Sequence, residues 1–170
     1  MPEGYAIQAI QSVLNSQQAY CKFLSANDSG ATGGHQSGIL ISKSAKNMMF
    51  SQDLKGENIL KRTVEIRWQD NSCTQSSFTY YSSKNELRIT RFGRNFSFLN
   101  PEQTGALFVF TKQDVDQYSG FFLETEEDIN QFLDAFGISP TETNRLIDAG
   151  QVQEETQERI AIQEFIAGLT

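Results

Sequence analysis

Four of the fourteen lysine and arginine residues lie within eleven positions of a single segment, KNELRITRFGRN, residues 84–95. They are Lys84, Arg88, Arg91 and Arg94. An arginine presents a planar fork of donors that matches the paired acceptors of guanine and also binds phosphate. In the same segment, Asn85 could bridge adenine and Glu86 could accept from cytosine. The segment has the chemistry to read base edges in DNA, and the alternative is a solvated basic strand end.

A second polar segment, SANDSGATGGHQSG, occupies residues 25–38 and contains four glycines. It is longer than most connections in a compact domain, and its glycines allow a backbone to approach a ligand closely. It lacks the Lys-Ser/Thr pair of a phosphate-binding loop and the GxGxxG spacing of a dinucleotide site. The segment is therefore either a ligand-binding loop that uses its polar side chains or a structured surface loop without a ligand.

Catalytic chemistry has little support in the sequence. His35 is the only histidine, and neither it nor Cys21 and Cys73 stand at a metal-ligand spacing. The strand segments lack the paired carboxylates and following lysine of a nuclease, and no Ser-His-Asp arrangement can be assembled. We expect no catalytic residue, no metal ligand and no cofactor for binding. A hydrogen bond to a base edge or a phosphate suits His35 better.

The net charge of -7 argues, by itself, against nucleic acid as a partner, but the charge is unevenly distributed. Residues 1–112 carry 12 basic and 8 acidic residues, whereas residues 113–170 carry 2 and 13. The chain is a mildly basic body followed by an acidic tail, for which a solvated helix surface is the simplest interpretation. No signal-peptide pattern and no long apolar stretch occur in the sequence. We expect a cytoplasmic protein that does not bind a membrane.

The elements that must position the two polar segments are mostly short strands. Apolar spacing predicts a helix over residues 6–19, strands over 20–24 and 39–41, and a short helix over 44–50. The alternation of apolar and polar residues over 60–69 predicts a half-buried strand, with Val64, Ile66 and Trp68 on one face and Arg62, Glu65 and Arg67 on the other. Further strands are predicted over 77–82, 86–91, 106–111 and 120–123. The fold is therefore mainly β, a barrel or sandwich of short, mostly antiparallel strands with flanking α-helices.

The last part of the chain is predicted to be helical. One helix begins after Thr125, which precedes three acidic residues, and ends at Gly137. Two more helices are predicted over residues 140–149 and 151–168. We divide the chain into a domain of residues 1–136 and a helical tail of residues 137–170. The tail either packs back on the body or leads toward another domain.

Three stretches of the sequence resemble the N-terminal effector domain of EcoRII-like (type IIE) restriction endonucleases. They are LSANDSGATGGHQSG at residues 24–38, LRITRFGR at 87–94 and NPEQTGAL at 100–107, in the same order and at similar separations. The first is specific because chance would rarely reproduce so irregular a string. The resemblance covers roughly residues 15–125. It implies a DNA-binding pseudobarrel, related to plant B-three-type domains, whose two arms grip the major groove.

The resemblance also implies which residues bind DNA. Those of the first arm are Lys22, Ser25, Asn27, Asp28, Thr32, His35 and Gln36, and those of the second are Lys84, Asn85, Glu86, Arg88, Arg91 and Arg94. The chain departs from the EcoRII pattern at Phe23 and Leu87, which replace basic residues, and at Phe92, which replaces a tryptophan. These departures remove two charges from the arms and bear on the number of phosphate contacts.

The resemblance implies a partner and a larger protein as well. The partner would be double-stranded DNA with a CCWGG-type site, bound by a monomer, and Mg²⁺ would be needed only by a separate catalytic domain of the same polypeptide in a bacterial cytoplasm. Two alternatives remain open. One is a small DNA-cleaving enzyme that uses His35 as base or the acidic tail as a metal site. The other is a protein-interaction domain that uses its acidic helices and binds no DNA.

Overall fold

The structure is a computed structural model that describes residues 4–29, 38–51, 59–93, 96–152 and 154–168. Within these ranges the chain builds one eight-stranded sheet with the strand order β2-β5-β4-β3-β7-β6-β1-β8. The strands are β1 Gln18–Phe23, β2 Gly38–Ile41, β3 Leu60–Trp68, β4 Cys73–Tyr81, β5 Glu86–Thr90, β6 Leu107–Lys112, β7 Gln117–Leu123 and β8 Arg145–Leu146. All neighbours are antiparallel except β3 and β7, which run parallel. The prediction of a mainly β fold with short strands is confirmed.

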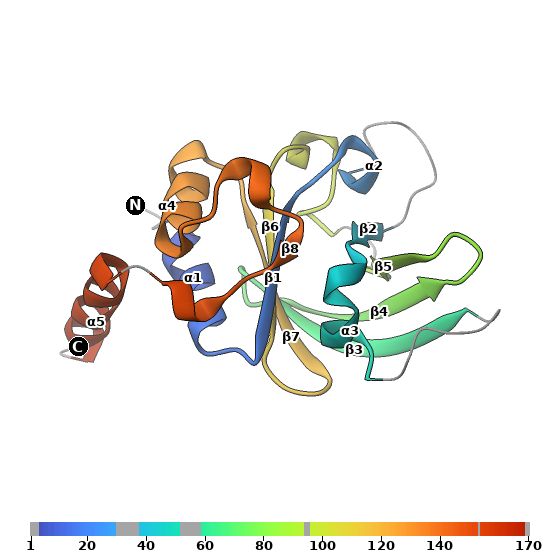
Figure 1. Cartoon of the computed structure of the whole chain (residues 1–170), viewed down its shortest axis with the longest axis horizontal. Helices are drawn as coiled ribbons and strands as arrows, with labels where there is room; N and C mark the ends of the chain where they lie inside the picture. The colour runs from blue at the N-terminus through green and yellow to red at the C-terminus, as the bar shows by residue number, and fades with distance from the viewer. Residues whose placement is uncertain (1–3, 30–37, 52–58, 94–95, 153, 169–170) are drawn as a thin grey trace.

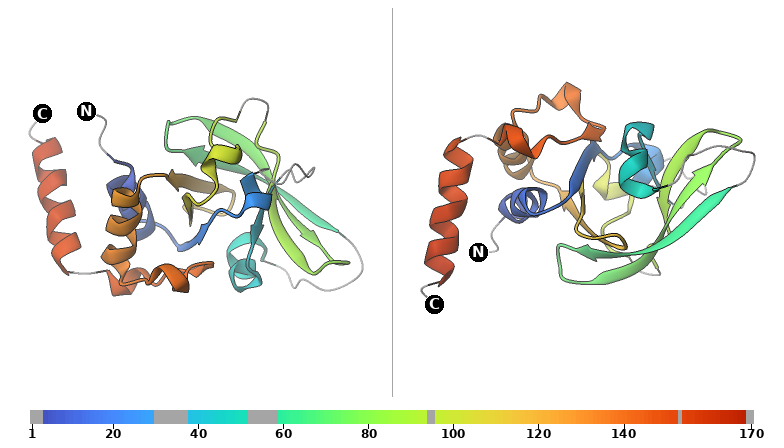
Figure 2. Two further views of the ribbon diagram at one scale, coloured as in Figure 1. Left: turned by 90° about the horizontal axis from the view of Figure 1, so that it is seen from above. Right: turned by 60° about the horizontal axis from the view of Figure 1, so that its bottom comes forward.

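Helices flank the sheet on both sides of its long central strands (Figure 1). The α-helices are α1 Ala6–Leu14, α2 Ala26–Ser29, α3 Lys46–Met49, α4 Glu126–Phe136 and α5 Glu154–Gly168. Short 3-10 turns cover Lys43–Ala45, Pro101–Gln103, Pro140–Glu142 and Ala149–Gln151. As predicted, Thr125 caps α4 by accepting from the backbone N–H of Asp128, and Gly137 ends it in the left-handed conformation at φ 65°. Helices α1 and α4 pack together against β6 and β7, whereas α5 stands at the edge of the molecule (Figure 2).

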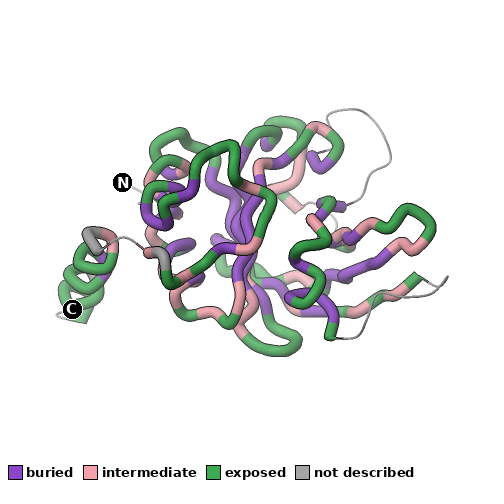
Figure 3. The backbone as a smooth tube through the Cα atoms, in the orientation of Figure 1, coloured by how far each residue is buried: buried purple, intermediate pink, exposed green. Residues whose placement is uncertain are grey.

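Alternation along β6 divides the apolar residues into two cores. Phe108 and Phe110 point into the barrel, where they join an aromatic cluster with Trp68, Phe78, Tyr118 and Phe122. Leu107 and Val109 point the other way and contact the apolar faces of α1 and α4. The buried residues concentrate along these central strands (Figure 3). Two-sided burial explains why β6 is apolar almost without interruption.

The barrel closes between β1 and β2 through side chains rather than through a strand ladder. β2 ends the sheet on one side, and β1 lies next to the other end. The hydroxyl of Tyr20 on β1 accepts from the backbone N–H of Ser42 just after β2 at 3.1 Å. The same hydroxyl donates to the side-chain oxygen of Asn144. This gap in the ladder is what makes the fold a pseudobarrel.

The prediction of a helix over residues 140–149 is wrong. Pro140–Glu142 forms one 3-10 turn, and Arg145–Leu146 forms β8, which pairs with β1. Asn144 adopts φ 65° and donates its backbone N–H to the carbonyl of Cys21 at 2.7 Å, which turns the chain onto the sheet edge. The sheet therefore extends beyond residue 136, where we predicted the domain to end. Of the described side chains of α5, Ile160 is buried against the second core.

The predicted orientation of Arg62 is also wrong. Arg62 is separated from Val64 and Ile66 by two and four positions, so its side chain lies on the core side of β3 and not on the solvent-exposed side. Its guanidinium donates to the carbonyl of Met49 at 2.6 Å and to the hydroxyl of Tyr118 at 3.1 Å. It also lies over the rings of Tyr118 and Phe78 and closes one end of the aromatic core.

Candidate nucleic-acid interface

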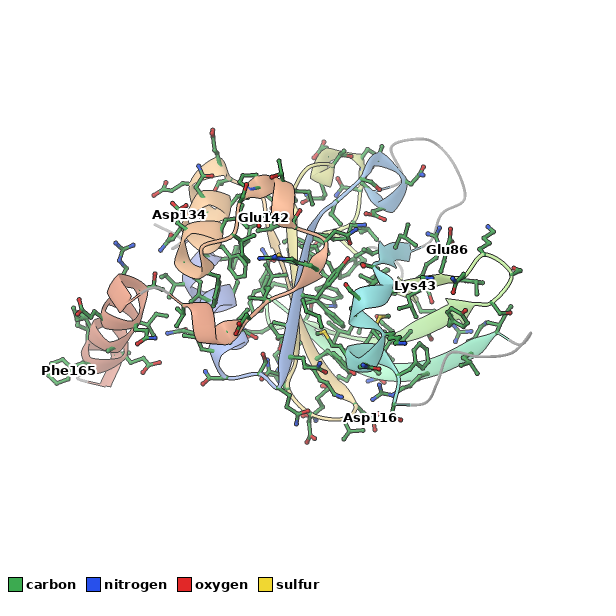
Figure 4. The ribbon with its side chains drawn as sticks, viewed as in Figure 1. Lys43, Glu86, Asp116, Asp134, Glu142 and Phe165 are labelled. Carbon is green, nitrogen blue, oxygen red and sulfur yellow. The ribbon has the colours of Figure 1, made fainter. Side chains whose placement is uncertain are left out.

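The two polar segments meet side by side in the sheet. The first arm, residues 22–36, contains most of the glycine-rich polar segment and precedes β2 in the chain. The second arm, residues 84–95, includes β5. Because β2 pairs with β5, Gly38 lies opposite Thr90 and Leu40 opposite Arg88. A separation of about 4.8 Å between neighbouring strands puts the start of β2 next to the second arm. Figure 4 shows Glu86 of the second arm on the far side of the molecule from Asp134 and Glu142.

The second arm presents a polar face outward and an apolar face inward. Leu87 and Ile89 are fully buried in the core, so Glu86, Arg88 and Thr90 point to the other side of the sheet. Glu86 Oε2 accepts from Arg88 Nε at 3.3 Å and from Arg88 Nη2 at 3.1 Å. One edge of the guanidinium is thereby held, and its terminal edge keeps the two parallel N–H donors that a bidentate contact needs.

The tip of the second arm is a tight turn between β4 and β5. Asn85 has φ 53°, a conformation that asparagine tolerates better than most residues. Its side-chain oxygen accepts from the hydroxyl of Tyr80 at 2.7 Å, which fixes the orientation of the amide. Lys84 and Asn85 are both exposed, so the tip can present a cation and an amide to a ligand.

Arg91 lies at the opposite end of β5. It is exposed, and its φ of 64° breaks the strand. The hydroxyl of Ser76 donates to its carbonyl at 2.9 Å and holds this irregular backbone in place. Arg91 and Phe92 stand at the rim of an open hollow of about 600 Å³ that reaches the β3–β4 turn at Ser72. Arg94 lies outside the described residues.

The described part of the first arm divides into exposed and buried residues. Ser25 and Asn27 are exposed. Lys22 and Asp28 are 7% and 2% exposed, and their side chains form an ion pair with a 2.7 Å separation. In this conformation neither of these two predicted DNA-binding side chains reaches the surface. The other members, Thr32, His35 and Gln36, lie outside the described residues.

The third motif, residues 100–107, anchors the base of the first arm. Leu24 donates its backbone N–H to the carbonyl of Ala106 at 2.9 Å and accepts from the N–H of Gly105 at 3.0 Å. Gly105 has φ 91°, which a residue with a Cβ rarely adopts. The hydroxyls of Ser29 and Thr104 share a 2.5 Å hydrogen bond. The motif thus has a structural reason to accompany the first arm.

Lys61 is a candidate interface residue that the sequence reasoning missed. The β3–β4–β5 register aligns Lys61, Thr79 and Arg88 in one row across the polar face of the sheet. Thr79 is 1% exposed and lies between the two cations. Lys61 has the parity of Glu65 and Arg67, so the alternation of β3 was the signal that could have identified it.

The clear pKa shifts among the described residues have identifiable physical causes. Burial raises the pKa of the Cys21 thiol to about 12 and raises the pKa of the Tyr118 hydroxyl. Hydrogen bonds from Ser72 lower the pKa of Asp70.

Among the residues that the structure describes, no three His, Cys, Asp or Glu side chains gather as a metal site. In the same ranges, no helix has the length and apolarity to span a membrane.

Comparison with known proteins places the chain in a family. The chain is 35% identical to the type II restriction enzyme EcoRII of Escherichia coli in a 99-residue alignment that covers 52% of this chain and 24% of that enzyme. It thus spans about a quarter of that relative. The crystal structure of the UbaLAI restriction endonuclease B3 domain with cognate DNA has the same fold, with a TM-score of 0.55 and 19% identity over 84% of this chain and 94% of that chain. The model of the family "Restriction endonuclease EcoRII, N-terminal" matches residues 13–142, so the chain belongs to that family.

Proposed function

We propose that this chain is the recognition, or effector, domain of a restriction endonuclease and binds double-stranded DNA at a specific sequence without cleaving it. The proposal rests on the family of the chain and on the arrangement of its two arms. The B3 domain that shares its fold was solved with cognate DNA, which supports the same class of ligand here.

The observation that carries the proposal is the pairing of β2 with β5. β2 follows the first arm by two residues, and its Gly38 and Leu40 lie opposite Thr90 and Arg88 of the second arm, about fifty residues further along the sequence. The major groove is about 12 Å wide and admits a two-stranded ribbon. Two neighbouring strands of roughly 5 Å separation, with their side chains, fit that width. The two arms therefore enter the major groove together.

The residues of the second arm divide between base and phosphate contacts. Arg88 reads a guanine through the terminal edge that Glu86 leaves available. Lys84 and Arg91 lie near the two ends of β5 and bind phosphates, which fixes the register on the duplex. Asn85 and, outside the described residues, His35 and Gln36 add hydrogen bonds to base edges.

The recognised site is a CCWGG-type sequence, as the family resemblance implies. A single domain covers the whole site, so the chain binds as a monomer. The partner domain is a catalytic domain of the same polypeptide, and Mg²⁺ belongs to that domain and not to DNA binding. The relative in Escherichia coli is about four times as long as the matched region, which leaves room for such a domain.

A gel-shift panel tests the proposal. The duplexes carry CCWGG, each single-base variant of it, and a random sequence of equal length. We expect the CCWGG duplex to bind at least about a thousandfold more tightly than the random duplex, with each mismatch costing about 1–3 kcal/mol. Equal affinity for all duplexes would refute sequence-specific recognition. Cleavage of the labelled duplex in Mg²⁺ would refute the non-catalytic assignment.

A further inference from the structure

A buried ion pair holds the first arm to the edge of the sheet. Lys22 Nζ on β1 lies 2.7 Å from Asp28 Oδ2 on α2, and the two side chains are 9% and 1% exposed. Both side chains also bond to the backbone of one residue in β2. Lys22 Nζ donates to the carbonyl of Leu40 at 2.7 Å, and the N–H of Leu40 donates to Asp28 Oδ1 at 3.0 Å. We call this set, Lys22, Asp28 and the Leu40 backbone, the Leu40 clamp.

The clamp satisfies the free edge of the sheet. β2 is a terminal strand, so the backbone groups of Leu40 that point away from β5 have no strand partner. In an antiparallel pair, every second residue directs its N–H and carbonyl away from the neighbour. Leu40 is such a residue, and the charged pair supplies one acceptor and one donor. Asp28 makes one further hydrogen bond within its own segment, since Oδ2 also accepts from the N–H of Ser25 at 3.0 Å.

The position of the clamp in the chain suggests more than edge protection. Asp28 precedes residues 30–37 and Leu40 follows them, so the clamp joins the described residues on either side of that range. Leu40 is also the residue opposite Arg88. The contact thus fixes the base of the first arm relative to the guanidinium of the second. Edge protection alone does not require charged residues, because neutral polar side chains can supply the same donor and acceptor and a buried ion pair is costly to desolvate.

We propose that Lys22 and Asp28 are positioning residues that pre-organise the first arm for base readout and do not themselves contact DNA. The inference rests on the proposed function. A ligand that meets a pre-organised arm spends less binding free energy on ordering it. Loss of the clamp should therefore weaken the cognate complex, in which both arms must fit the bases. Random DNA, bound through phosphates alone, should be little affected.

A double-mutant cycle tests the clamp with Lys22→Met, Asp28→Asn and the pair of changes, in the whole chain. Affinities are measured for CCWGG and random duplexes across a salt series. We expect each single variant to lose on the order of tenfold in cognate affinity and the double variant to lose no more than the worse single one. The random-DNA affinity and the slope of log affinity against log salt should stay at the wild-type values.

The opposite outcomes are distinct. If Lys22 contacts a phosphate, Lys22→Met will weaken both duplexes alike and reduce the salt slope by about 0.9, and additive losses in the cycle would likewise overturn the clamp. Should a single variant fail to fold, Lys22→Met combined with Asp28→Leu removes both buried charges. This variant should fold and still lose the cognate preference, and retention of that preference would overturn the inference. If the wild-type chain binds no CCWGG duplex, the proposed function fails first and the clamp with it.

Discussion

The role of Arg88 can be tested with a substitution that keeps its charge. Arg88→Lys retains one positive charge on β5 but replaces a planar fork with a single ammonium group. In the structure, Glu86 holds the Nε edge, so a base contact must use the terminal edge that lysine lacks. A bidentate contact to guanine is worth about 1–3 kcal/mol of discrimination. Arg88→Lys should therefore lower cognate affinity by roughly 5- to 150-fold.

The same substitution should leave the affinity for random DNA almost unchanged. A phosphate contact depends on charge, and Arg88→Lys conserves it, so the salt slope should stay constant. Arg88→Ala should give the same cognate loss and also reduce the slope by up to about 0.9 if the side chain adds a phosphate contact. Fluorescence anisotropy with labelled CCWGG and random duplexes at four or more salt concentrations measures both quantities.

A cation remote from the arms provides the matched control. Lys112 lies at the end of β6 opposite Gln18, whereas the first arm begins toward the other end of β1 at Lys22. Lys112→Gln should change neither affinity by more than about twofold, because charges beyond a Debye length of about 8–10 Å are screened. Equal losses of cognate and random binding in Arg88→Lys would show that Arg88 is not a base contact. No loss at all would remove Arg88 from the interface.

Other predictions concern the fold. A thiol reagent should label exposed Cys73 quickly and leave Cys21 unlabelled until the chain unfolds, which mass spectrometry can follow. Burial raises the pKa of Cys21 to about 12 and that of Tyr20 as well, whereas the unfolded thiol ionises near 9. The free energy of unfolding in urea should thus fall as pH rises from about 9, by up to about 1.4 kcal/mol per pH unit for each such group, and fall less steeply in Cys21→Ala. Gly120→Ala would place a Cβ 2.4 Å from the Trp68 ring, so we expect a loss of about 1–3 kcal/mol in unfolding free energy and an unchanged fold by circular dichroism.

Periodicity predicted most of the sheet because burial on one face leaves a two-residue pattern. The alternation of Leu87 and Ile89 identified β5 and the outward direction of Arg88. β8 could not be predicted in the same way, since two residues are too short for any pattern. It depends on the left-handed backbone of Asn144 and on its bond to Cys21, a contact between residues 123 positions apart. Tertiary pairing of this kind leaves no local signal.

Residue type alone did not predict the burial of the charged side chains. The charge of Arg62 suggested a wet surface, but cation–π contacts and a carbonyl partner stabilise it at the end of the core. In the same way, Lys22 and Asp28 look like surface residues of a polar arm. Each is buried because the other neutralises it, and they lie six positions apart in sequence on different elements. Contacts between side chains on different elements decide whether a charged residue is exposed, and a single sequence does not show these contacts.

The acidic residues of the tail bear on DNA binding through their distance from the arms. A domain of net charge -7 should repel DNA unless the acids lie far from the contact face. The exposed residues Glu124, Glu127 and Asp134 belong to α4 or lie just before it, and α4 packs on α1 rather than near β5. These three acids therefore lie on elements that do not pack against β5. If the arms bind DNA as proposed, these acids would oppose binding of DNA at α4.

Neutralising these acids tests this expectation. In Glu124→Gln/Glu127→Gln/Asp134→Asn, affinity for random DNA should rise about two- to threefold at roughly 0.02 M salt, where the Debye length exceeds 20 Å. The gain should disappear near 0.15 M salt, because the remaining distance to the arms is then screened, and the ratio of cognate to random affinity should not change. An equal gain at both salt concentrations would mean that DNA lies directly against α4. The two-arm interface would then be wrong, because no duplex seated on β2 and β5 would contact that helix.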